Sequence, residues 1–116
     1  MLPKSARLKK KKDIEKVLKT GRKFKEDFLI LAIIKNHLGK IRFGFIVSQA
    51  VSKKATTRNK LKRRLRELIQ VKLNKMEKGT DGIILALPGL ETKDFWEIET
   101  AVNRLFQKAQ ILIQLR

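Results

Sequence analysis

The residues with the clearest chemical potential are basic side chains that crowd one short segment. Residues 53–66 contain eight lysines and arginines and no acidic residue. Lysine supplies a compact positive charge and arginine a planar fork of donors, and both bind phosphate. Because no carboxylate in the segment offsets their repulsion, we expect a polyanionic ligand, namely nucleic acid. The side chains predicted to contact it are Lys53, Lys54, Arg58, Asn59, Lys60, Lys62, Arg63, Arg64 and Arg66.

Catalysis by the chain's own side chains has little support. The sequence contains one histidine, no cysteine and no tyrosine, and its carboxylates are scattered. Acid–base, nucleophilic and metal-dependent catalysis each need several such groups together. We therefore predict no catalytic residue and no metal site within the chain. His37 is expected to be a solvated residue of the turn at 36–39, and Trp96 to pack in the first turn of a helix.

The charge of the chain is unevenly distributed. In all, 29 basic and 11 acidic residues give a net charge of +18 over 116 residues. Residues 1–78 hold 25 basic and 6 acidic residues, a net charge of +19, whereas residues 79–116 hold 4 and 5, a net charge of −1. One part of the chain is therefore expected to face the anion.

The absence of cysteine excludes disulfides and thiolate metal sites. The N-terminal segment is basic, but no apolar run of signal-peptide or membrane-spanning length follows it. These features predict a cytoplasmic protein.

Apolar periodicity predicts the elements of the N-terminal half. A short helix is expected to begin at a capping Asp13 and to end at Gly21 in the left-handed conformation. The runs 28–34 and 41–47, separated by turn residues, predict two or three antiparallel strands from Phe24 onward.

The C-terminal half is predicted to contain two helices around one buried strand. The first helix has about five turns, opens at Arg58 and Asn59, and ends its apolar pattern at Gly79. Residues 82–87 predict the strand, and Asp94 with Glu97 predicts a capping box for the last helix, whose apolar stripe includes Leu112 and Ile113. The chain is thus expected to fold as one domain over 1–116, a single-domain α-β sandwich of the α+β class with the order α-β-β(-β)-α-β-α.

The basic segment should form the N-terminal half of the five-turn helix. Arg58 and Lys62 fall where the apolar stripe meets the surface, and the other cations cover both flanks. Cations at this end add to the positive end of the helix dipole, which lowers stability and favours anion binding.

RNA is a better candidate than DNA or a membrane. A helix-turn-helix DNA reader presents its basic helix from an all-helical bundle, whereas this helix is predicted to follow strands. A membrane-surface module needs an exposed apolar face, whereas the apolar faces here pair as a core. A ribosomal or ribosome-assembly protein remains an alternative, because it would share the size, charge and RNA preference of this chain.

Four segments resemble the protein subunit of bacterial ribonuclease P. They are "LPKSARLKKKKDIEKVLKTGRKF", "RFGFIVS", "RNKLKRRLRE" and "KGTDGIILA", and together they span nearly the whole chain. The third resembles the family signature R-N-R-x-K-R, with Lys60 in place of the second arginine. Ile14 and Leu18 occupy positions often held by phenylalanine, and Leu31 one often held by an aromatic residue.

The resemblance implies a function in tRNA processing. A catalytic RNA and the Mg²⁺ ions that it holds would cleave precursor tRNA at its mature 5′ end, without an obligate protein partner. This chain would bind that RNA through the signature helix and hold the 5′ leader in a cleft that includes Ile14, Leu18 and Leu31. The resemblance also implies a left-handed crossover before the basic helix, against the right-handed rule.

Overall fold

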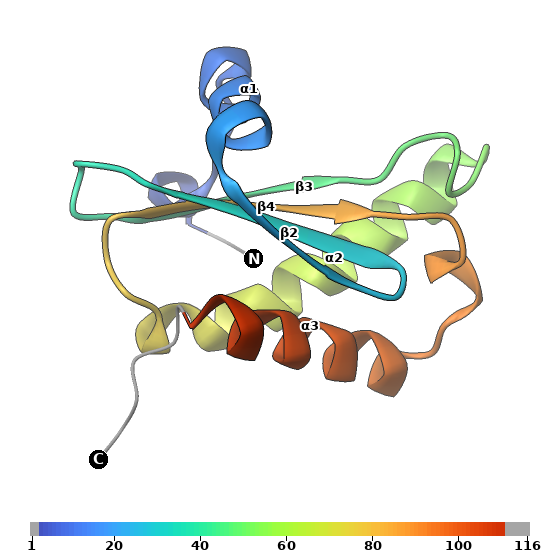
Figure 1. Ribbon diagram of the computed structural model, residues 1–116. Helices are drawn as coiled ribbons and strands as arrows, with labels where there is room; N and C mark the ends of the chain where they lie inside the picture. Colours follow the sequence, from blue (N-terminus) through green and yellow to red (C-terminus); the bar gives the residue numbers. More distant parts are fainter. Residues whose placement is uncertain (1–2, 111–116) are drawn as a thin grey trace.

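The computed structural model describes residues 3–110, which form one four-stranded sheet covered by helices on both faces (Figure 1). The order is that of the sequence prediction, α-β-β-β-α-β-α, with three short 3₁₀ turns added. The helices are α1 (Lys11–Thr20), α2 (Ala55–Lys72) and α3 (Phe95–Ala109), and the strands are β1 (Arg22–Glu26), β2 (Leu29–Lys35), β3 (Ile41–Ile46) and β4 (Thr80–Ala86).

The strands lie in the order β1-β2-β4-β3. β2 pairs antiparallel with both β1 and β4, whereas β3 pairs parallel with β4, so that Ile41 lies opposite Thr80. The prediction of antiparallel strands is therefore correct for β1 and β2, but β4 separates β2 from β3. The parallel β3–β4 pair is joined through α2, as a crossover requires. The left hand of this crossover stays an expectation from the family resemblance.

Two apolar clusters lie on the two faces of the sheet, because successive strand residues point to opposite sides. In β2, Leu29, Leu31 and Ile33 belong to the larger cluster, which lies between the sheet and the helices α2 and α3. Ala32 belongs to the smaller cluster, which lies between the sheet and α1. Val17 is the buried α1 residue of this cluster. Figure 1 shows α1 alone above the sheet and the other two helices below it.

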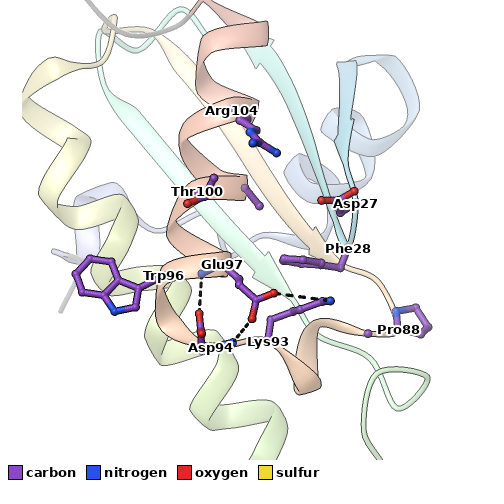
Figure 2. A pocket seen from close by; sticks show the side chains of 11 residues that line it. Asp27, Phe28, Pro88, Lys93, Asp94, Trp96, Glu97, Thr100 and Arg104 are labelled. Carbon is purple, nitrogen blue, oxygen red and sulfur yellow. Dashed lines mark hydrogen bonds and ion pairs between the residues drawn. The ribbon is translucent and has the colours of Figure 1, made fainter.

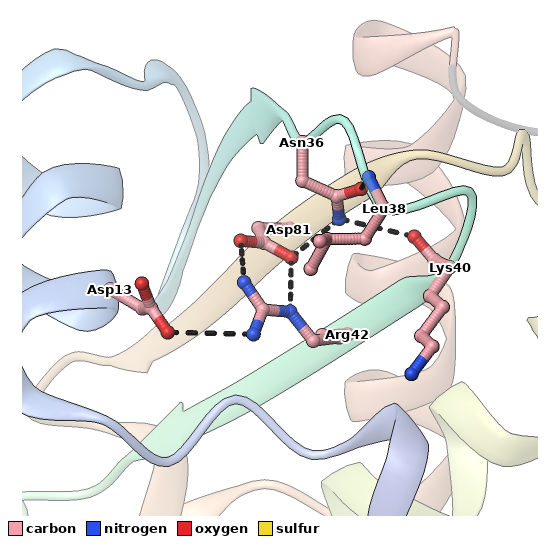
Figure 3. A network of polar contacts seen from close by, with 6 residues as sticks. All are labelled: Asp13, Asn36, Leu38, Lys40, Arg42 and Asp81. Atoms are coloured by element: carbon pink, nitrogen blue, oxygen red, sulfur yellow. Dashed lines mark hydrogen bonds and ion pairs between the residues drawn. The ribbon is translucent and has the colours of Figure 1, made fainter.

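A polar network ties α1 to the sheet on this less covered face (Figure 3). Arg42 of β3 lies between Asp13 of α1 and the buried Asp81 of β4, and it forms ion pairs with both. Asn36, in the turn after β2, donates to Asp81 at 2.7 Å and to the Lys40 carbonyl at 3.1 Å. The hydrogen bonding that Arg42 donates to Asp81 is the main cause that raises the pKa of Arg42 above its usual value.

Two details of α1 correct the sequence prediction. The helix begins after Lys10, whose side chain does not cap it, and Asp13 lies in the first turn and binds Arg42 instead. Gly21 is extended, at φ −70°, rather than left-handed. Glycine is still required there, because a Cβ atom would collide with the Val17 carbonyl oxygen and lie 2.8 Å from that of Ile33.

The predicted end of α2 is wrong, whereas the predicted start of α3 is correct. The α-helical part of α2 stops at Lys72 and a 3₁₀ turn follows, so that Gly79, at φ +81°, belongs to the loop before β4. The capping box of α3 is confirmed, because Asp94 Oδ1 accepts from Glu97 N at 2.8 Å and Glu97 Oε1 accepts from Asp94 N at 3.2 Å. Leu112 and Ile113 of the predicted stripe lie outside the described residues.

Candidate nucleic-acid interface

The N-terminal half of α2 is held by a narrow apolar stripe that leaves its cations accessible. Leu61 and Leu65 are buried at the spacing of one helical turn, and Leu68 and Ile69 continue the stripe. Lys54 occupies the N-cap without a side-chain hydrogen bond. The first N–H groups of α2 therefore add their partial positive charge to that of the basic side chains.

The predicted RNA-binding residues are brought together on this half of α2 and the loop before it. Within residues 3–110, no ion pair joins any of their eight cations to a carboxylate. They divide by exposure. Exposed are Lys53, Lys54, Asn59, Lys60 and Arg63; partly buried are Arg58, Lys62, Arg64 and Arg66.

Arg58 has a structural contact that the sequence did not predict. Its Nη1 atom donates to the carbonyl oxygens of Ser52 and Lys53, at 3.0 Å each. The side chain thus fastens the loop that precedes α2, and the Ser52 hydroxyl accepts from the Lys54 N–H at 3.3 Å. Arg58 therefore shapes the basic surface as well as adding charge to it.

Some cations elsewhere in the fold are paired with carboxylates. Glu26 of β1 binds Lys108 of α3 at 2.6 Å and Arg104 at 3.3 Å. The hydrogen bond from Lys108 is the main cause that lowers the pKa of Glu26 below its usual value. These neutralised groups contrast with the α2 cations, whose repulsion only an external anion can relieve.

The proposed leader cleft is not assembled as the sequence suggested. Leu31 has no exposed surface and points into the cluster under α2 and α3. Ile14 and Leu18 pack on the opposite face of the sheet, partly buried, against the cluster that contains Val17. The grouping of Leu31 with them is therefore wrong, because alternation along β2 sends residue 31 away from α1.

Two single residues have different outcomes. His37 is exposed in the turn after β2, as predicted. The packing prediction for Trp96 is wrong, because 71% of this residue is exposed and its nearest ring is that of Phe95, edge-on at 5.7 Å. Figure 2 shows Trp96 in the first turn of α3, and Lys93, which precedes the helix, reaching toward Glu97 beside a hollow of about 730 Å³.

Two classes of site have no counterpart in the described part of the chain. Residues 3–110 contain no cluster of three or more histidine, cysteine or acidic side chains placed to hold a metal ion. None of the described helices is long and apolar enough to span a membrane.

The match with known families agrees with this geometry. The family model described as Ribonuclease P matches residues 2–110, which include the whole sheet and all three helices. The chain belongs to the ribonuclease P protein family. The signature segment of the sequence resemblance lies on the exposed basic half of α2.

Relatives and solved structures in the ribonuclease P family cover nearly the whole chain. A ribonuclease P protein component from Microcystis aeruginosa is 34% identical over 115 residues, which is 96% of this chain and 96% of the relative. The RNase P protein of Staphylococcus aureus shares the fold with a TM-score of 0.87, at 24% identity over 94% of this chain and 99% of that one. The RNase P protein of Thermotoga maritima gives a TM-score of 0.78 at 27% identity, over 88% and 96%.

Proposed function

We propose that this chain is the RNA-binding protein subunit of a bacterial ribonuclease P, a ribonucleoprotein that cleaves precursor tRNA at its mature 5′ end. The observation that carries the proposal is the basic half of α2 with the loop before it, whose eight cations have no ion-pair partner in residues 3–110. Membership in the ribonuclease P protein family supports ribonuclease P RNA as the ligand of this surface. The catalytic RNA binds there, and release of its counterions drives the association.

The proposal divides the work between the RNA and this chain. The RNA holds the Mg²⁺ ions and carries out the chemistry. The chain supplies phosphate-binding cations and exposed N–H groups at the start of α2, which bind and position RNA. The complex works in the cytoplasm and requires no membrane and no further protein.

The second RNA contact of the proposal is the 5′ leader of the precursor. It runs along the face of the sheet that α1 covers only in part. Ile14 and Leu18 remain the α1 residues of this path, because both are partly buried and border that face. Leu31 does not belong to this path, because its side chain is fully buried on the other face of the sheet.

The test is reconstitution. The purified chain is added to a bacterial ribonuclease P RNA and a labelled precursor tRNA, at a Mg²⁺ concentration too low for the RNA to act efficiently alone. We expect cleavage at the mature 5′ end to be stimulated more than tenfold. A ribosomal or assembly role predicts instead no stimulation, and copurification of the tagged chain with ribosomal RNA.

A further inference from the structure

The N-terminal segment before α1 contacts the edge strand β3 through an isolated bridge. Leu8 N donates to the Phe43 carbonyl at 2.9 Å, and Arg7 forms a parallel bridge with Phe43. Residues 7–9 are called the arm below. Because strand residues alternate, Leu8 points toward α1, where it is buried, and its two basic neighbours point toward α2.

A glycine in β3 permits this close approach. A Cβ atom on Gly44 would lie 3.2 Å from the Leu8 carbonyl oxygen and 3.6 Å from the Leu8 Cβ. A side chain at position 44 would therefore require the arm backbone at Leu8 to shift by a few tenths of an ångström. The position of the arm is set by backbone contact and by burial of Leu8.

The arm, β3 and α2 enclose a basic groove. Its volume is about 300 Å³, and its cationic lining is Arg7 and Lys9 from the arm and Lys62 and Arg66 from α2. No acidic residue is among the described side chains that line it. Phe45, partly buried beside the larger apolar cluster, supplies part of the floor.

The groove separates the α2 cations into two groups. Lys62 and Arg66, one helical turn apart, face the arm, whereas Arg63 is exposed to solvent. Four cations converging on one concave, partly apolar surface concentrate positive potential more than the same charges on a convex helix. The volume lies at the lower end of the roughly 300–1,000 Å³ that is typical of small-ligand sites. The groove is therefore large enough for one or two monomers of an extended polymer chain.

We propose that this groove binds the phosphodiester backbone of single-stranded RNA, with Lys9 and Arg7 as phosphate-binding residues beside Lys62 and Arg66. The inference rests on the proposed function for the identity of the RNA, and it extends the RNA surface from α2 to the arm. Phe45 offers an apolar contact for a sugar or base beside the bound phosphate. The strand comes from the catalytic RNA or from the precursor leader, which share this chemistry.

Lys9→Gln tests the charge contribution of the arm, and Lys10→Gln is the matched control. Both lysines are exposed, but Lys10 does not line the groove. We expect Lys9→Gln to weaken binding to ribonuclease P RNA five- to tenfold and to reduce the magnitude of the log–log salt slope by about one unit. Lys10→Gln should change the dissociation constant less than twofold. Equal effects of the two substitutions would overturn the proposal.

Gly44→Ala tests the geometry without changing any charge. We expect the added Cβ to shift the arm at Leu8 and to lower RNA affinity at least threefold, while the melting temperature checks that the chain is folded. Unchanged affinity in a variant whose Leu8 amide has lost protection from hydrogen exchange would contradict the assigned site.

To identify which RNA occupies the groove, the comparison of Lys9→Gln with the wild type is repeated with leader-bearing precursor tRNA and with leaderless tRNA. A loss of affinity confined to leader-bearing precursor, relative to leaderless tRNA, assigns the groove to the leader, and an equal loss for both assigns it to the catalytic RNA. A twelve-nucleotide single-stranded RNA reports on the groove alone. If the wild type binds this oligonucleotide in a Lys9-dependent way but does not stimulate cleavage, the groove stands and the proposed function falls.

Discussion

The guanidinium of Arg42 donates two hydrogen bonds to the carboxylate of Asp81, from Nε to Oδ1 at 2.9 Å and from Nη2 to Oδ2 at 2.6 Å. Only 7% of the Asp81 side chain and 19% of the Arg42 side chain are exposed. The third nitrogen reaches Asp13 at 3.4 Å, so that one side chain links two strands of the sheet to α1. This link holds the helix beside the face along which the leader is proposed to run.

Breaking the Arg42–Asp81 pair should destabilise the fold. Arg42→Met leaves Asp81 buried with Asn36 as its remaining polar partner, and we expect the free energy of unfolding to fall by about 3 kcal/mol in urea titration. The double variant Arg42→Met, Asp81→Leu should recover part of this loss, because no charge is left buried. Asp13→Asn is the control, with a loss below about 1 kcal/mol, since 33% of its side chain is exposed.

The salt dependence of RNA binding should report the α2 cations one at a time. Arg63→Ala or Arg64→Ala should each reduce the log–log slope of the affinity for the catalytic RNA by about one unit. Arg104→Ala is the control, because this side chain pairs with Glu26 on another part of the surface and should leave the slope unchanged. A wild-type affinity that does not vary with salt would exclude the electrostatic basis of the interface.

Arg58 should contribute to RNA binding through its hydrogen bonds to the loop before α2 as well as through its charge. Arg58→Lys keeps the positive charge but loses the guanidinium Nη1 group that donates to the Ser52 and Lys53 carbonyls. We expect faster hydrogen exchange in residues 50–54 and RNA affinity at least threefold weaker, whereas Lys60→Arg should change neither. Wild-type exchange and affinity in Arg58→Lys would show that the loop does not depend on this contact.

Leucines on the two faces of the sheet should behave differently. Leu31→Ala should lower the free energy of unfolding by about 2–5 kcal/mol, because it opens a cavity in the core. The folded fraction should keep the wild-type preference for leader-bearing over leaderless precursor. Leu18→Ala should narrow that preference, measured as the ratio of the two dissociation constants with the assembled complex. A preference that follows Leu31 and ignores Leu18 would reverse the assigned faces.

The histidine should be dispensable for cleavage. His37 is exposed in a turn, and His37→Ala should leave the cleavage rate of the reconstituted complex within about threefold of the wild type. Loss of a general base would slow the reaction about a hundredfold. A decrease of that size in single-turnover kinetics, with unchanged precursor affinity, would place chemistry in the protein.

Local signals in the sequence determined the elements and the ligand class. The spacing of Leu61, Leu65, Leu68 and Ile69 predicts α2, and the pair Asp94 and Glu97 predicts the start of α3, because helix period and capping depend on residues a few positions apart. The excess of cations in 53–66 indicated a polyanion for the same reason, since charge density along the chain is a local property.

Relationships between distant segments were decided by the tertiary structure. A continuous apolar run such as 28–34 is buried on both sides, so that its pattern does not reveal that Leu31 faces α2 and α3 rather than α1. Asp13 was read as a cap because the sequence does not show Arg42 approaching it across the sheet. The basic groove likewise exists only because β3 brings the arm and α2 together, which places Lys9 beside Lys62 although 53 positions separate them in the sequence. Such contacts depend on the order of the strands, and no local pattern fixes that order.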